Sequence, residues 1–260
     1  MTDRPIPSVG VALTAFKRLH LLPKQLEAIA AQTVKPARIV LWANADFMLD
    51  SSVQVPDDVE VWSFGYNAGV WARMVNSQFL GTDYVAVFDD DTIPGPRWLE
   101  NCLRVQQEIG PSLVGAAGVS FAGGRREQRI YSGWSNPLPA IIRVDIVGHA
   151  WFFPSSLLSG WDASLPAKWP TCGEDYYLAY QAQKRGWPVV TAPHPHTNKD
   201  WWGSLDGMQG TDDVALYRQP GEEEKKAAFH KLTVDGGWQP NAAKVTGDGD
   251  VELQLTYVDR

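Results

Sequence analysis

The chain has 260 residues, of which 44% are hydrophobic and 20% charged, proportions typical of a globular protein that forms one large domain or two small ones. Its formal net charge of −7 argues against a nucleic-acid-binding protein, because such proteins need a positively charged surface. No apolar run approaches the roughly 18 residues of a membrane-spanning helix, and the opening "MTDRPIPSVG" is unlike a secretory signal, so we expect a cytoplasmic protein without a membrane span.

The first half of the sequence alternates apolar runs with amphipathic stretches. Apolar runs predict strands at 9–14, 38–43, 59–64 and 84–88. Apolar residues at helical spacing predict one helix after the first strand and another over 69–80. Such alternation predicts an α/β fold whose central sheet is mainly parallel and flanked by helices.

The second half is less regular. We predict helices at 98–107, 174–185 and about 221–231, strands at 113–121, 141–147 and 188–192, and a long Gly- and Arg-bearing loop at 123–139. We expect residues 1–200 to form the main domain. Residues 201–260 are expected to be a C-terminal appendage, or a lid, packed on that domain.

Three consecutive acids, Asp89, Asp90 and Asp91, directly follow the predicted strand 84–88. Sheets with parallel strands bind ligands at the carboxyl ends of their strands. Neighbouring carboxylates repel one another, so the triplet is costly unless water, hydrogen-bond donors or a cation offsets the repulsion. Mg²⁺ and Mn²⁺ take oxygen ligands and keep positions open for phosphate oxygens, so the triplet predicts a metal site. The alternative is a set of solvated acids in the turn "TIPGP".

Two further acids, Glu174 and Asp175, begin a predicted helix. Adjacent helical residues point about 100° apart, so at most one of them aims directly into a given site. A helix N-terminus favours an ionised carboxylate, and a permanently ionised acid at a substrate cleft suits a general base. The alternative is an acidic first turn that only stabilises the helix.

Two histidines, His194 and His196, follow the predicted strand 188–192 in "APHPHTN". Residues two apart in an extended segment face the same side, so both are candidate metal ligands. The alternative is a pair of surface histidines.

Read in order, these segments resemble the inverting nucleotide-sugar glycosyltransferases of the GT-A fold, and are family-two-like, from about Val9 to His196. The stretch "YNAGVWARMVNSQFLGTDYVAVFDDDTIPGPRWLE" is similar to that family's N-x-G-x-x-x-A-R-N-x-G, G-D-Y-V-x-F-L-D-D-D and P-x-W-L-E. "VGVALTAFKR" is similar to its opening V-S-V-V-I-P-T-Y-N-R, and "GEDYYLAYQAQKRGW" to its G-E-D-x-D-L-x-x-R-x-x-x-x-G-Y. The resemblance implies a metal-dependent inverting glycosyltransferase that uses Mn²⁺ or Mg²⁺. It would move a sugar from a nucleotide-diphosphate donor to a hydroxyl of a glycan or other acceptor.

The resemblance also assigns roles to residues. Asp175, with Glu174 beside it, is implied as the catalytic base. Asp89 and Asp91 are implied as metal ligands, with His196 or His194 completing the metal site. The implied donor-binding residues are Thr14, Phe16, Asn44, Asn67, Arg73, Asp89, Asp90, Gly148 and His149. Trp201 and Trp202 are implied at the acceptor. Ala43 stands where the family often has an aspartate that reads a uridine base, so the donor base stays open.

Two other classes of protein share single features of the sequence. Phosphatases of the haloacid dehalogenase type carry Asp-x-Asp-x-Thr after an apolar strand. Asp89 and Asp91 fit that pattern, but Thr92 is one place early, and four predicted elements precede the motif. A non-catalytic carbohydrate-binding module would instead use some of the 12 tryptophans to stack on sugars, and would need neither a metal nor Asp175.

Overall fold

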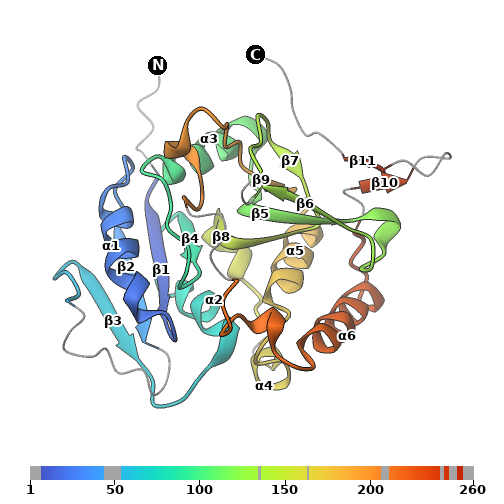
Figure 1. Ribbon diagram of the computed structural model, residues 1–260, viewed down its shortest axis with the longest axis horizontal. Helices are drawn as coiled ribbons and strands as arrows, with labels where there is room; N and C mark the ends of the chain where they lie inside the picture. The colour runs from blue at the N-terminus through green and yellow to red at the C-terminus, as the bar shows by residue number, and fades with distance from the viewer. Residues whose placement is uncertain are drawn as a thin grey trace.

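The computed structural model describes residues 7–43, 54–133, 136–162, 164–205 and 211–240, together with the backbone of two short strands near the C-terminus. The fold is α/β, with a nine-stranded mixed sheet flanked by helices (Figure 1). The strand order is β3-β2-β1-β4-β8-β5-β9-β7, and β6 pairs with β5. The predicted α/β class is therefore confirmed. In the described part of the chain, no helix has the length and apolar character needed to cross a bilayer.

The first half of the sheet is wholly parallel. Its strands are β1 (Val9–Ala15), β2 (Arg38–Ala43), β3 (Val59–Ser63) and β4 (Tyr84–Phe88). Both faces of β1 are buried, which explains its unbroken apolar run. The predictions for β2 and β4 are confirmed at both ends, and those for β1 and β3 to within one residue.

The second half of the sheet contains antiparallel strands. Its members are β5 (Leu113–Phe121), β6 (Arg129–Gly133), β7 (Ile142–Arg143), β8 (Ile146–Pro154) and β9 (Val189–Thr191). β8 lies antiparallel between β4 and β5. Of the nine strands, β6, β7 and β8 run against the other six. Most strands of the sheet thus run in the same direction, but several neighbouring strands pair antiparallel.

Two predictions in this half are wrong. The run 141–147 is two strands, because the backbone N–H of Val144 donates to Val189 whereas that of Asp145 donates to Val119. The predicted loop 123–139 contains β6, which forms an antiparallel ladder with β5. Both strands are defined by partners far along the chain.

Helices cover both faces of the sheet. They are α1 (Leu22–Ala30), α2 (Ala72–Ser77), α3 (Trp98–Ile109), α4 (Leu165–Lys168), α5 (Glu174–Lys184) and α6 (Glu222–Asp235). Short 3₁₀ turns are η1 (Leu19–Leu21), η2 (Gly69–Trp71), η3 (Ala122–Gly124), η4 (Ser155–Leu158), η5 (Lys199–Trp201) and η6 (Leu216–Arg218). β10 (Ala243–Val245) pairs with β11 (Val251–Leu253). The predictions for α3, α5 and α6 are confirmed, although α6 runs four residues further; the predicted helix 69–80 is only η2 and α2.

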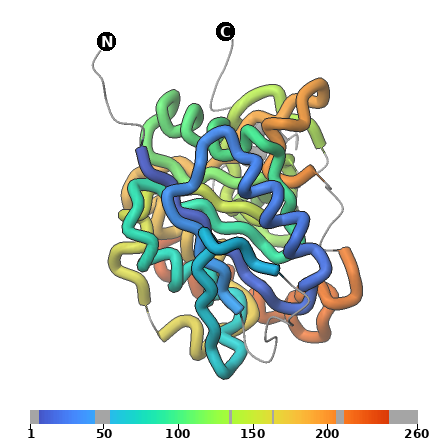
Figure 2. The backbone as a smooth tube through the Cα atoms, turned by 90° about the vertical axis from the view of Figure 1, so that its left-hand side faces the viewer, coloured from blue at the N-terminus to red at the C-terminus, as the bar shows by residue number. Residues whose placement is uncertain are grey.

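Two apolar cores lie on opposite faces of the sheet. Leu26 of α1 and Leu99 of α3 belong to one core, and Figure 2 shows α1 in front of the strands. Met74 of α2 and Leu178 of α5 belong to the other. Phe229 of α6 joins this second core, where its ring meets Trp71 and Trp169. Helix α6 therefore packs against the same core as α2 and α5.

The junction between α5 and α6 depends on Gly173. Its φ is +104°, and a Cβ there would lie 2.5 Å from the ring of Phe229. We expect Gly173→Ala to lower the free energy of unfolding by about 3 kcal/mol or more, because left-handed strain and overpacking add. Gly186→Ala is the matched control, since Gly186 has a φ of +70° but no atom near its Cβ position. It should lose about 1 kcal/mol. Equal losses in urea unfolding would contradict the packing role.

Candidate functional site

A cavity of about 780 Å³ lies at the carboxyl ends of β1 and β4. Its lining includes residues after β1, the three aspartates after β4, and the start of β8. The start of α5, the segment 211–219 and the first turns of α6 complete the wall. Parallel sheets bind ligands at this edge, so the triplet occupies the position where a ligand site is expected.

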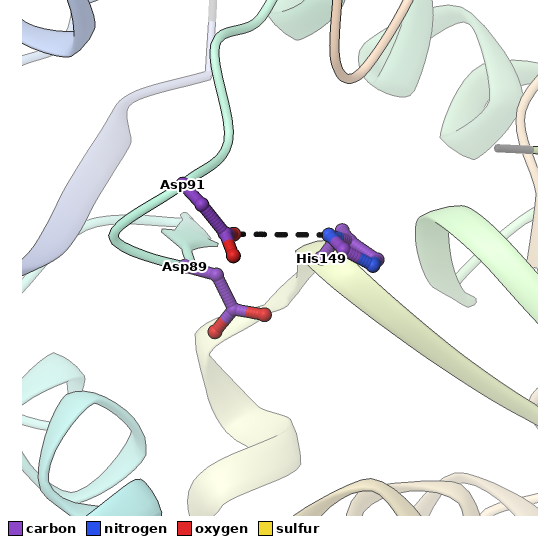
Figure 3. Close-up of side chains that lie close together, drawn as sticks. All are labelled: Asp89, Asp91 and His149. Atoms are coloured by element: carbon purple, nitrogen blue, oxygen red, sulfur yellow. Dashed lines mark ion pairs between the residues drawn. The ribbon is translucent and has the colours of Figure 1, made fainter. Parts of the chain in front are cut away.

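Antiparallel pairing brings His149 to the acidic triplet. Ala150 of β8 pairs with Phe88, the last residue of β4, so His149 lies beside Asp89. The backbone N–H of Asp89 donates to the carbonyl of His149 at 3.0 Å, and the Thr92 hydroxyl donates to the same oxygen at 2.8 Å. Asp89, Asp91 and His149 point toward one another (Figure 3). Each offers one possible metal-ligand atom, and these three atoms all lie within 4.8 Å of one another. His149 has a φ of +66°, a strained conformation that is concentrated at functional sites.

The donor set fits a divalent cation. Asp91 is 4% exposed, and its Oδ1 has no hydrogen-bond partner among the described residues. Nδ1 of His149 lies 3.9 Å from this oxygen. Burial lowers the pKa of His149, which favours the neutral imidazole that a metal requires. The cluster thus offers two carboxylates and one imidazole, and one of the carboxylate oxygens is buried without a hydrogen-bond partner among the described residues. These donors are chemically suited to Mn²⁺ or Mg²⁺.

Neither histidine predicted as a metal ligand belongs to this cluster. His194 is buried, with Nδ1 3.0 Å from the carbonyl of Ala192 and Nε2 2.8 Å from that of Asn136. His196 is exposed, and the cluster found among the described residues includes neither of the two. The histidine that lies in the cluster is His149. The resemblance placed His149 in the donor pocket, but its contact with Asp91 depends on the pairing of β8 with β4.

Two arginines offset the charge of the triplet. Nη1 of Arg18 lies 2.6 Å from Oδ1 of Asp90 and 3.2 Å from Oδ2 of Asp91. Nη2 of Arg73 lies 3.1 Å from Oδ1 of Asp89. The sequence-based interpretation included Arg73 but missed Arg18, whose only sequence signal was its position just after the first strand. These contacts explain how three consecutive aspartates are tolerated in a largely buried setting.

Glu174 and Asp175 differ in their partners. Glu174 is buried, and its Oε1 accepts a hydrogen bond from Nη2 of Arg73 at 3.0 Å. Asp175 lines the cavity, and its Oδ1 has no hydrogen-bond partner among the described residues. Both acids line the cavity, so they differ in their partners and not in their access to it.

The structure opposes the expectation of a permanently ionised Asp175. Burial, followed by the neighbouring Glu174, raises the pKa of Asp175 well above its ordinary value. Burial also raises the pKa of Glu174. Helix N-termini favour carboxylates only modestly, so desolvation outweighs this effect here. Burial therefore disfavours the ionised form of Asp175, whereas nearby positive charge favours it.

Most of the predicted donor-binding residues come together. Besides Arg73 and the residues of the acidic cluster, the cavity is lined by Thr14, Phe16, Asn67 and Gly148. Asn44 lies outside the described residues. The Oγ1 of Thr14 is a second buried oxygen without a hydrogen-bond partner in the described part of the chain.

The two predicted acceptor tryptophans are not part of the cavity lining. Trp201 lies against the guanidinium groups of Arg97 and Arg104, at 4.3 and 4.4 Å from the ring centroid. Trp202 is buried, and its Nε1 donates to the carbonyl of Pro195 at 3.0 Å. Two exposed tyrosines line the cavity instead, Tyr131 of β6 and Tyr217 of η6. Sequence reasoning missed both, because β6 was predicted to be a loop and residues 201–260 were expected only to form an appendage or a lid.

The chain matches no family model and no curated protein with which it was compared. Its described residues define a class of site without such help. That site is a large cavity at the carboxyl edge of an α/β sheet, with Asp89, Asp91 and His149 clustered at the end of β4 and the carboxyl group of Asp175 at the start of α5.

Proposed function

We propose that this protein is a metal-dependent inverting glycosyltransferase of the GT-A fold, which moves a sugar from a nucleoside-diphosphate donor to a hydroxyl of a glycan or other acceptor. The observation that carries the proposal is the group of Asp89, Asp91 and His149 in the same cavity as Asp175. A cation site for a diphosphate and a carboxyl group for an acceptor are the two parts that this chemistry requires.

At the donor end, Asp89, Asp91 and His149 would hold Mn²⁺ or Mg²⁺. When bound, the ion would supply positive charge to the diphosphate as the bond to the sugar breaks. Arg18 and Arg73 contact the aspartates of the triplet. Their guanidinium groups would therefore place additional positive charge beside the diphosphate leaving group. Phe16 and Asn67, which lie after β1 and β3, line the part of the cavity that we assign to the nucleoside.

At the acceptor end, Asp175 takes the proton of the acceptor hydroxyl as that oxygen attacks the anomeric carbon. Arg73 and Lys226 both act to lower the pKa of Asp175, against the larger effect of burial. Positive charge bound at Asp89 would act in the same direction and favour the ionised base. A single displacement with one base inverts the anomeric centre.

The proposal is tested by thermal unfolding with nucleoside diphosphates and nucleotide sugars, in Mn²⁺ or in EDTA, at pH 8 and pH 5. Burial and the neighbouring Asp89 raise the pKa of Asp91 from 3.8 to about 7. The contribution of Asp91 to the stability of the metal-free fold is therefore lost as pH rises from about 4 to about 7, because the folded state retains this proton longer than the unfolded chain does. A cation needs the ionised form, so we expect a larger Mn²⁺-dependent rise in Tm at pH 8 than at pH 5.

Two outcomes would contradict the proposal. Equal stabilisation by nucleotides in Mn²⁺ and in EDTA would favour a metal-independent binding module. No stabilisation by any nucleotide would exclude a nucleotide-dependent transferase. If a transferred product is obtained, its anomeric proton coupling measured by NMR checks the inversion.

A further inference from the structure

Three cationic side chains line the cavity at its α6 end: Arg126, Arg129 and Lys226. We propose that they bind a carboxylate or phosphate group on the acceptor, so that the acceptor is an anionic sugar. This proposal rests on the glycosyltransferase function proposed above. It adds the chemical class of the acceptor and the residues that select it.

The side chain of Arg126 is held in place by hydrogen bonds and an ion pair. Arg126 is 7% exposed, and its Nε donates to the hydroxyl of Tyr176 at 3.1 Å. Its two terminal nitrogens donate to the carboxylate of Glu223. Burying a guanidinium is costly unless it is paired, so these contacts fix its place at the cavity wall.

The three cations exceed the carboxylates that pair with them. Nη2 of Arg129 lies 3.0 Å from Oε1 of Glu223, the same carboxylate that binds Arg126. Among the described residues, Glu223 is the one acid that pairs with either arginine. Lys226 makes no ion pair or hydrogen bond in that part of the chain, although its charge acts to lower the pKa values of Glu174 and Asp175. One carboxylate thus serves two guanidinium groups, with an ammonium group nearby. This excess positive charge, facing a cavity, is complementary to an anionic ligand.

The cationic group lies on the acceptor side of the proposed base. The guanidinium of Arg73 contacts both Asp89 and Glu174. It therefore connects the cluster of Asp89, Asp91 and His149 to the start of α5. Tyr176, the residue after Asp175, binds Arg126. Asp175 therefore lies between the acidic triplet and the cationic group. The diphosphate belongs to the triplet, so an anion at the cationic group belongs to the acceptor.

Two exposed tyrosine rings line the cavity as well, and they favour a sugar as the molecule that bears the anionic group. Tyr131 is 57% exposed and Tyr217 is 53% exposed, and both line the cavity. Flat aromatic faces with a polar tip are suited to stacking on sugar rings. Guanidinium groups bind both carboxylate and phosphate oxygens in forked geometry, so a uronic acid and a sugar phosphate share the chemistry recognised here.

The inference is tested by NMR titration with D-glucuronate, D-glucose 6-phosphate and D-glucose, first in EDTA. We expect both charged sugars to bind more tightly than glucose, and their relative affinities to show which anion is preferred. Arg129→Gln and Lys226→Gln should each weaken charged-sugar binding by about tenfold, because a charge-assisted hydrogen bond is worth that much. Lys231→Gln, on the same helix but paired with Asp235, is the matched control and should change nothing. Equal Kd values for charged and neutral sugars in the wild type would overturn the inference.

A gain of binding separates this role from damage to the fold. Glu223→Gln removes the carboxylate that competes for both arginines while it keeps an oxygen for Arg126. We expect this variant to bind charged sugars several-fold more tightly. Weaker or unchanged binding in a folded Glu223→Gln protein would contradict the inference.

The titrations are then repeated with Mn²⁺ and a nucleoside diphosphate at saturation. Retained binding of the charged sugar supports an acceptor subsite. Competition with the diphosphate overturns it, because the anion then occupies the donor position. If the nucleotide itself fails to bind with Mn²⁺, the proposed function fails. The EDTA titrations of the variants would still decide whether the anion site exists.

Discussion

Asp91→Asn is expected to abolish the Mn²⁺-dependent binding of nucleoside diphosphates while the fold is retained. Asparagine keeps the shape of the side chain but removes the charge, and the cluster would keep only Asp89 and His149. We expect affinity for the metal–nucleotide pair to fall by about a hundredfold or more, since even groups that only support a ligand contribute tenfold to a hundredfold. Isothermal titration calorimetry measures the loss.

The same substitution makes an opposite prediction for stability. Above pH 7 the ionised Asp91 is buried among other acids, which is why its pKa is raised. Asp91→Asn should therefore raise the Tm of the metal-free protein at pH 8, as is common where a site trades stability for function. Asp58→Asn, at an exposed position, is the control and should change neither quantity. An Asp91→Asn protein that binds the metal–nucleotide pair normally would contradict the proposed cation site.

A second pair of variants decides which histidine serves the cluster. His149→Ala should weaken Mn²⁺ binding, whereas His196→Ala should leave it unchanged, because His196 is exposed and outside the cluster. The reverse result would restore the assignment made from the sequence. This comparison separates an error in the ligand set from an error in the metal site itself.

The predictable parts of the fold are those that local sequence defines. β2 and β4 were predicted with their bounds because buried parallel strands are continuous apolar runs. The run 141–147 looked equally strand-like, yet it divides at Asp145, whose carboxylate accepts the backbone N–H of Phe121 at 2.7 Å. That partner lies 24 residues away. No periodicity within 141–147 could reveal it.

The site shows the same division. The three aspartates were found because they are adjacent in the chain and follow a strand. His149 lies in their cluster only because Phe88 pairs with Ala150. Arg18, which follows β1, contacts the triplet only because its side chain extends to Asp90. The pKa of Asp175 was also misjudged from the sequence, because the helix N-terminus is a local feature whereas burial is a property of the whole fold.

One positive charge, that of Arg73, links the two ends of the cavity. The guanidinium of Arg73 contacts Asp89 on one side and Glu174 on the other, while its face lies 4.8 Å from the ring centroid of Trp151. Occupation of the acidic triplet by a cation therefore changes the charge around Glu174 and, through it, around Asp175. The raised pKa of Asp175 is consistent with a base whose ionised form is favoured when a cation binds nearby.

Asp175→Asn is expected to reduce the rate of sugar transfer by roughly 10²- to 10⁴-fold, the range for loss of a general base. Donor affinity in Mn²⁺ should stay nearly unchanged, because Asp175 makes no ion pair with Arg18 or Arg73 among the described residues. An effect on kcat with an unchanged donor Kd is the signature of a group needed only in the transition state. Steady-state transfer assays and calorimetry on the same preparation measure the two quantities.

The neighbouring acid provides the contrast that makes this result specific. Glu174→Gln leaves Arg73 with a weaker partner, and Arg73 also contacts Asp89 of the metal-binding group. We therefore expect Glu174→Gln to lower both donor affinity and Tm, because it weakens a buried ion pair. If Asp175→Asn instead turns over at the wild-type rate, the proton of the acceptor goes elsewhere and Asp175 is not the base. If both variants lose donor binding alike, the start of α5 serves the donor, and the division of the cavity into donor and acceptor ends is wrong.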